Sequence, residues 1–246
     1  MWQLPADIGP VVSAWVTVEL TEAPVVDELY FWALQASFSD AQGGDFGAAH
    51  TGLQWNPRHP HSGAFNWGGY PPQHANWKKN LQGSEPTLPG FKDDPNTRHY
   101  RWDAHTPYRI TISPGEPASD GTSGWRASVR NLATGAHTVM RDLWCGGDRL
   151  TGLCVWTEWF CPCDAPTVAV NWTEFRVRTE DGREHEPISV LLNHPTDGNC
   201  ANVGHRIISQ QPELVIEQRL NTERELPHAT VVPIRLPSTD FGSVSL

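Results

Sequence analysis

Short apolar–polar alternation is the feature of this chain that most restricts its fold. Alternating runs recur about every ten to fifteen residues, and no run of ten or more shows a convincing helical period. In residues 11–20, for example, apolar side chains at Val12, Ala14, Val16 and Val18 alternate with more polar neighbours. Clusters of Gly, Pro, Asn and Asp separate the runs. Many short strands without helices are typical of a sandwich or a barrel rather than an α/β fold.

We therefore predict an all-β fold with very little helix, in which two antiparallel sheets pack as a jelly-roll or concanavalin-like β-sandwich. The clearest strand-like runs are residues 11–20, 28–38, 50–56, 63–70, 108–112, 125–130, 137–140, 152–160, 167–177, 188–192 and 231–236. Residues 214–220 fit a strand or a short helix equally well, whereas 40–47 and 71–99 are expected to be turns and loop. The residues expected to be mostly buried are Val16, Tyr30, Trp32, Leu34, Ile110, Trp125 and Val129.

No composition shift marks a domain boundary, so residues 1–246 are expected to form a single β-sandwich domain. Its core would span about residues 11–182, with 183–246 as a C-terminal extension packed on it. The net charge of −10 argues against a nucleic-acid or anionic-membrane partner, and no apolar run approaches a membrane span of about 20 residues. Because the first residues do not resemble a signal peptide, we expect a cytoplasmic protein, or a secreted one if a leader was removed. The sequence leaves the oligomeric state open.

Five cysteines, an odd number, favour reduced thiols, and Cys154 is expected to be buried and free. In an exported protein, Cys161 or Cys163 could instead pair with Cys200. The Cys-Pro-Cys run lacks the second pair of ligands that zinc sites usually have. His59 and His61 could bind a metal ion, but no carboxylate or histidine at a typical ligand spacing accompanies them.

Calcium-binding and nucleotide-binding motifs are also missing from the sequence. The scattered acids Asp40, Asp45, Asp93 and Asp94 are a weak calcium alternative. We expect no metal and no cofactor.

Tryptophan is unusually frequent, with 12 residues against four tyrosines. Most of these indoles are expected in the core, and a few could form a stacking surface for sugars or other cyclic ligands.

The strand alternation places four candidate site residues on sheet faces. Trp156 and Glu158 share one face of their predicted strand, and His50 and Gln54 share one face of theirs. If these faces belong to one concave surface, they combine a ring, an amide and a carboxylate, a mixture that suits a polar cyclic ligand. An ordinary solvated sheet face would show the same pattern.

Two further candidates lie beside a glycine pair at 68–69. Asn66 and Trp67 point to opposite faces and could form the rim of the site, although a tight aromatic corner explains the glycines as well. Paired carboxylates for glycoside hydrolysis are less defined: Glu158 could act with Glu174 on the next run, with Asp142 and Asp148 also nearby in sequence.

Several runs resemble the DUF3472 group of proteins of unknown function and its actinobacterial relatives. The most specific of these are Gly-Leu-Gln-Trp at 52–55 and Asn-Trp-Gly-Gly-Tyr at 66–70, within a resemblance that covers roughly residues 11–182. The resemblance implies a concanavalin-like or jelly-roll sandwich and weakly suggests carbohydrate-related work.

Two functions remain open. In the first, the chain is a binding module that holds a glycan or another polar ring-containing small molecule, with Gln54, Asn66, Trp67 and Trp156 as ligand contacts. In the second, it is a cofactor-independent lyase, cyclase or hydrolase that acts on a small molecule or sugar and uses Glu158 or His50 as acid or base. The sequence does not decide whether the protein is an enzyme.

Overall fold

The computed structural model describes residues 1–72, 81, 96–194 and 200–234 of the chain. Sixteen strands and one short 3₁₀ turn, Pro60–Ser62, make up its regular structure. The strands are β1 (Trp2–Gln3), β2 (Val11–Glu22), β3 (Tyr30–Ser39), β4 (Asp45–Trp55), β5 (Gly63–Tyr70), β6 (Thr97–His99), β7 (Tyr108–Pro114), β8 (Gly124–Asn131), β9 (His137–Trp144), β10 (Arg149–Trp159), β11 (Ala169–Thr179), β12 (Glu184–His185), β13 (Ser189–Leu192), β14 (Val203–Ser209), β15 (Val215–Leu220) and β16 (Thr230–Pro233).

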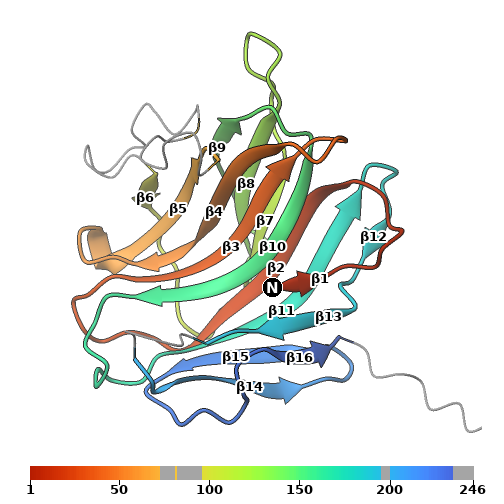
Figure 1. Ribbon diagram of the computed structural model, residues 1–246. Helices are drawn as coiled ribbons and strands as arrows, with labels where there is room; N and C mark the ends of the chain where they lie inside the picture. Colours follow the sequence, from red (N-terminus) through yellow and green to blue (C-terminus); the bar gives the residue numbers. More distant parts are fainter. Residues whose placement is uncertain (73–80, 82–95, 195–199, 235–246) are drawn as a thin grey trace, which may run out of the picture.

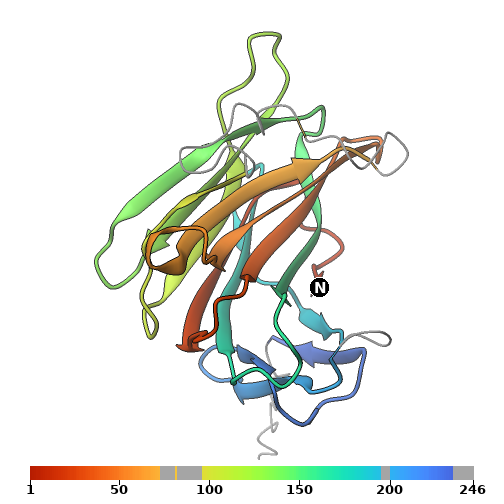
Figure 2. The same ribbon diagram turned by 90° about the vertical axis from the view of Figure 1, so that its left-hand side faces the viewer.

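Two large antiparallel sheets form the body of the molecule. The five-stranded sheet has the order β10-β3-β4-β5-β6. The eight-stranded sheet runs β14-β15-β11-β2-β7-β8-β9, with β12 paired to β11. Figures 1 and 2 show the two sheets facing each other, with the C-terminal strands gathered at one end of the sandwich. The predicted all-β sandwich with very little helix is confirmed.

A small third sheet, β1-β13-β16, joins the N-terminal residues to the C-terminal part of the chain. In this sheet Trp2 pairs with Val190. β14 and β15 instead extend the large sheet, because β15 pairs with β11. After residue 182, the described strands β12, β14 and β15 are therefore hydrogen-bonded into the eight-stranded sheet, and β13 and β16 form the small sheet with β1. The division into domains stays a prediction.

The core lies between the inner faces of the two large sheets. Successive residues of β3 alternate between the two faces of the sheet: Trp32 and Leu34 face the core, and Phe31 and Ala33 on the opposite face are buried as well. Phe38 of β3 stacks on Trp125 of β8 with ring centroids 5.3 Å apart, which joins the sheets across the core. All seven residues expected to be buried are buried, each 2% exposed or less.

The strand boundaries differ from the predicted ones where local alternation is weak. β4 begins at Asp45, inside the segment expected to be a turn, and residues 215–220 form a strand. The sequence analysis missed β1, β6 and β12, which have two or three residues, and β14, whose sequence VGHRIIS does not alternate regularly. No helix among the described residues is long and apolar enough to cross a membrane.

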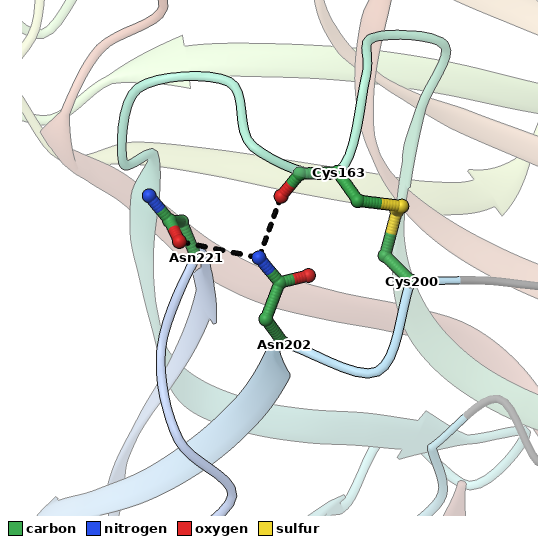
Figure 3. The surroundings of a disulfide bond; sticks show 4 residues. All are labelled: Cys163, Cys200, Asn202 and Asn221. Atoms are coloured by element: carbon green, nitrogen blue, oxygen red, sulfur yellow. Dashed lines mark hydrogen bonds between the residues drawn. A yellow bond between two sulfur atoms is a disulfide. The ribbon is translucent and has the colours of Figure 1, made fainter.

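One disulfide bond, between Cys163 and Cys200, links the segment after β10 to the segment before β14 (Figure 3). Asn202 Nδ2 donates hydrogen bonds to the Cys163 carbonyl oxygen at 2.5 Å and to Asn221 Oδ1 at 3.2 Å. The expectation of reduced thiols is therefore wrong for this pair, and the alternative pairing with Cys200 is the one formed. Sequence reasoning could not decide this, because the two cysteines become neighbours only through the fold. Cys154 is free, as predicted, but half-buried.

Candidate functional site

The outer face of the five-stranded sheet brings together five of the six candidate site residues. Register pairs Glu158 of β10 with Phe31 of β3, and Phe31 with Gln54 of β4. The same faces carry Trp156, opposite Ala33, and His50, opposite Gln35. Asn66 of β5 lies opposite Gly52, so it shares this face as well. We call this surface the outer face.

Trp67 is on the other side of the sheet. It is fully buried in the core, and the alternation of β5 separates it from Asn66. Its predicted role as a ligand contact is therefore not supported by its position. The alternative of a tight corner at residues 68–69 does not agree with the structure either, because both glycines lie within β5 and pair with His50 and Ala49 of β4.

An aromatic cluster fixes the middle of the outer face. The ring of Trp156 meets Phe31 edge-on at 5.0 Å and His50 at 5.6 Å between centroids, and His50 also contacts Tyr70 at 6.0 Å. The Trp156 Nε1–H donates a 3.1 Å hydrogen bond to Gln35 Oε1. Because the indole is held by both ring packing and a hydrogen bond, it forms a fixed wall rather than a mobile surface side chain.

Glu158 is the carboxylate of this face. The residue is exposed at the sheet edge, and partial desolvation of its carboxyl group raises its pKa above the ordinary glutamate value. No hydrogen bond or ion pair engages its carboxylate within the part of the chain that the structure describes. Glu158 thus combines a raised pKa with carboxylate oxygens that have no partner among the described residues, and an acid or base in catalysis needs both properties.

Gln54 presents an amide donor to the same face. Its side chain is only 5% exposed, and Asn56 Nδ2 donates a 3.2 Å hydrogen bond to its Oε1. Its backbone carbonyl accepts a second bond, of 2.9 Å, from Trp102 Nε1. Because the amide oxygen is occupied by Asn56, the Nε2 group is the part of Gln54 left to donate to a ligand.

His50 is a neutral imidazole at physiological pH, because burial among the rings lowers its pKa to about 4. In this state one ring nitrogen can donate a hydrogen bond and the other can accept one, but the ring carries no positive charge. Tyr70 and Cys154, on the same face, have pKa values raised by burial. The centre of the face is therefore uncharged, and Glu158 is its ionisable edge.

The side chain of Asn66 is more buried than that of a residue at the rim of a site would be. It is 6% exposed, and its Nδ2 donates a 3.0 Å bond to Thr97 Oγ1, while Oδ1 is buried without a hydrogen-bond partner. It braces β5 against β6 and supplies at most one acceptor to the face.

The other acids considered for a catalytic pair are engaged elsewhere. Glu174 is in the eight-stranded sheet, where its Oε1 forms a 2.8 Å ion pair with Arg109, and Asp142 forms one of 2.8 Å with Arg126. Burial tends to raise the pKa of Glu174, but hydrogen bonds from Thr17 and Arg109 outweigh it and leave the pKa lowered. Asp148 pairs with its neighbour Arg149. Glu158 and Glu174 are on β10 and β11, which follow each other in sequence but belong to different sheets.

The possible metal ligands are dispersed. No group of three or more His, Cys, Asp or Glu in the described ranges could hold a metal ion. Asp40 and Asp45 accept bonds from nearby backbone N–H groups, while Asp93 and Asp94 lie outside the described residues.

No family model matches the sequence, and no curated protein matches it. The resemblance to the DUF3472 group therefore stays a prediction. Three solved structures are similar to the chain over most of its length. Two are of Scytalido-glutamic peptidase, one with a peptide-based transition state analog and one with a transition state analog inhibitor. The first has a TM-score of 0.46 at 10% identity, the second 0.43 at 12%, and each alignment covers 85% of this chain and 92% of the other.

The third is SCP-B, a member of the eqolisin family of peptidases, in complex with the tripeptide Ala-Ile-His. Its TM-score is 0.45 at 11% identity, with 87% of this chain and 94% of the other covered. Similarity at this level does not assign an activity to this chain.

Proposed function

We propose that the outer face is the active site of a hydrolase in which Glu158 is the general acid and base and Gln54 stabilises charge on the substrate. The observation that carries this proposal is the register Glu158–Phe31–Gln54 across three adjacent strands. Two strand spacings place the Cα atoms of Glu158 and Gln54 about 10 Å apart. The carboxylate and the amide therefore lie on either side of the Phe31 ring, and we propose that the reacting group of the substrate binds over this ring between them.

The chemistry follows from the two functional groups. With Glu158 ionised, its carboxylate accepts a proton from water as the water oxygen bonds to a carbonyl carbon of the substrate. The carbonyl π electrons move to the oxygen, and the Gln54 Nε2–H group donates a hydrogen bond to the resulting oxyanion. When the intermediate collapses, the bond to the leaving nitrogen or oxygen breaks, and protonated Glu158 returns its proton to that atom.

The face favours acyl substrates over glycosides. Glycosidases usually need two carboxyl groups, one on each side of the scissile bond. Among the outward-pointing side chains of residues 31–37, 48–54, 64–70 and 154–158, Glu158 is the sole carboxylate. An amide donor opposite a single carboxyl group matches the needs of amide or ester hydrolysis, in which negative charge develops on one oxygen.

A binding module is the second candidate function, and the fixed indole of Trp156 favours it. An indole held by Gln35 and Phe31 is preorganised for stacking on a sugar or another ring. In such a module Glu158 would accept hydrogen bonds from ligand hydroxyl groups.

Turnover assays on a panel of peptides, esters and glycosides separate these functions. We expect hydrolysis of a peptide or ester, and Glu158→Gln should lower kcat by roughly 10²–10⁴ with little change in substrate binding. Gln54→Leu should lower kcat by about 10²–10³, because it removes the oxyanion donor. Glu184→Gln on β12, an exposed strand residue outside the face, is the matched control and should retain full activity.

Glycan binding without turnover on any substrate, weakened by Glu158→Gln, would instead establish the binding module. Turnover that survives Glu158→Gln would overturn the proposed catalytic role.

A further inference from the structure

A cavity of about 280 Å³ lies on the opposite side of β10 from Glu158. Its wall includes the inward-facing Val155, Thr157 and Trp159 of β10, together with Trp32 of β3 and Trp172 of β11. Cys154 and Trp156 of β10, which belong to the outer face, also line it. The rest of the wall comes from Tyr30, Val168, Phe175, residues 1–2 and 190–194, and the paired strands β14 and β15. It is therefore a space between the large sheets and the small sheet, and it adjoins the outer face at Cys154 and Trp156.

The size of this space is not explained by imperfect packing. Protein cores contain few voids larger than a water molecule. An engineered apolar cavity of about 150 Å³ in another protein is large enough to bind benzene. Met1 is 53% exposed and Asn193 is exposed, so the cavity reaches the surface beside these two residues. A small molecule thus has both room and an entrance.

The wall is mostly apolar, and its charged groups are the paired Arg219 and the N-terminal amine of Met1. Arg219 is the one charged side chain of the lining within the described part of the chain, and Glu22 and Glu217 pair with it. The N-terminal amine of Met1 donates a 2.9 Å hydrogen bond to the Leu191 carbonyl oxygen, and burial lowers its pKa. An ionised ligand would lose its hydration in these mostly apolar surroundings, so we expect the cavity to favour uncharged molecules.

Two histidines make one end of the cavity polar. The Trp172 indole, which can only donate, bonds to Gln218 Oε1 at 2.7 Å, so Gln218 Nε2 is the donor in its 3.0 Å contact with His205 Nε2. The proton of neutral His205 is therefore on Nδ1. His194 Nε2 donates to the Leu226 carbonyl oxygen at 3.0 Å, which leaves His194 Nδ1 as an acceptor.

Both free imidazole nitrogens are buried without a hydrogen-bond partner, and the two rings are 4.7 Å apart. Burial is the main cause that lowers both pKa values, that of His205 to about 3, so both rings are neutral at physiological pH. The pair offers one donor and one acceptor side by side, which matches a hydroxyl or an amide group.

The indoles of Trp2 and Trp32 add two buried N–H groups without partners. Buried unsatisfied donors are uncommon in native proteins and call for an explanation. Both indoles line the cavity, so an oxygen of a bound ligand is a candidate acceptor for them.

We propose that this cavity is a binding site for an uncharged, mainly apolar small molecule that carries a hydroxyl or amide group, with the apolar body among the tryptophans and the polar group against His194 and His205. Most of its lining lies on the other side of the sheet from Glu158, and the site adjoins the proposed hydrolytic face at Cys154 and Trp156.

Fluorescence titration with N-phenyl-1-naphthylamine, an uncharged apolar dye, tests the site. We expect saturable binding to one site, with dye emission excited by energy transfer from the cavity tryptophans. Val155→Phe should fill the cavity and weaken binding roughly tenfold or more. The matched control, Val139→Phe, changes an exposed valine of β9 outside the lining and should bind as the wild type does. Glu158→Gln should also bind normally, which distinguishes this site from the outer face.

Competition against the dye tests the ligand class. We expect 1-naphthol to displace it better than naphthalene, and 1-naphthoate to be the weakest of the three. If Val155→Phe does not fold, Leu191→Phe fills the same cavity from the opposite wall. Non-saturable dye binding, equal binding by a folded cavity-filling variant, or best displacement by naphthoate would each overturn the proposal.

Discussion

Glu158 and Gln54 lie on opposite sides of Phe31 on one sheet face, each paired with it by strand register. The carboxyl group reaches this position from an edge strand, β10, and the amide from an inner strand, β4. Because the sheet itself sets the spacing, the pair is held by backbone hydrogen bonds rather than by a mobile loop.

The pH dependence of hydrolysis should report the ionisation of Glu158. Burial raises the pKa of this carboxyl group, and the proposed mechanism requires its ionised form at the start. We therefore expect kcat/KM to rise with pH through a pKa above the ordinary glutamate value of about 4.3. Glu158→Gln should abolish this limb in the residual activity, whereas His50→Gln should leave it in place. An acid limb at or below the ordinary value would contradict the role given to Glu158.

Acid should destabilise the fold through two buried histidines. Burial lowers the pKa of His50 to about 4 and that of His205 to about 3, while an unfolded chain has histidine pKa values of about 6.5. Between these limits the unfolded state binds more protons, so the free energy of unfolding falls as the pH falls from about 6.5 to about 4. Urea denaturation at several pH values should show that the free energy of unfolding changes with pH. The slope contributed by these two residues should approach that of two protons.

His50→Gln should reduce this slope by about one proton. The control His137→Gln, on exposed β9, should leave the slope unchanged. An unchanged slope in His50→Gln would show that the imidazole of His50 titrates alike in the folded and unfolded states.

Local alternation predicted the fold class, most strands and the placement of His50, Gln54, Trp156 and Glu158 on single faces. Period-two patterns determine which side of a strand a residue occupies, and they also placed Asn66 and Trp67 on opposite faces. They do not determine which strands are neighbours, so the contact of Phe31 with both Glu158 and Gln54 required the structure. The cavity could not be predicted either, because its lining comes from sequence segments as distant as Trp2 and Gln218.

The disulfide bond gives a prediction for thiol chemistry. Cys163 and Cys200 are bonded, and the free cysteines are Cys145, Cys154 and Cys161. Titration of the denatured, unreduced protein should therefore find three reactive thiols, and five after reduction. The Cys163→Ser/Cys200→Ser variant should be less stable by about 2–4 kcal/mol, since the bond closes a loop between residues 37 apart in sequence. Five thiols before reduction would show that the bond does not form in solution.

Gly52 allows β3 and β4 to approach closely beneath the proposed site. A Cβ atom at this position would lie 1.8 Å from the Trp32 carbonyl oxygen and 2.9 Å from the Ala33 Cα, both backbone atoms of the neighbouring strand. Gly52→Ala must therefore push the two strands apart, and Gln54 is two residues further along β4. We expect a loss of about 3 kcal/mol in the free energy of unfolding, measured by urea denaturation. The hydrolytic activity of the protein that remains folded should fall as well, because the spacing between Gln54 and Glu158 changes.

Gly204→Ala is the matched control: its Cβ would meet only the Thr222 methyl group at 3.2 Å and backbone at 3.3 Å or more, in a strand outside the five-stranded sheet. The control should cost about 1 kcal/mol or less and retain activity. Equal stability of the two variants would mean that the close approach of β3 and β4 at Gly52 relaxes without cost.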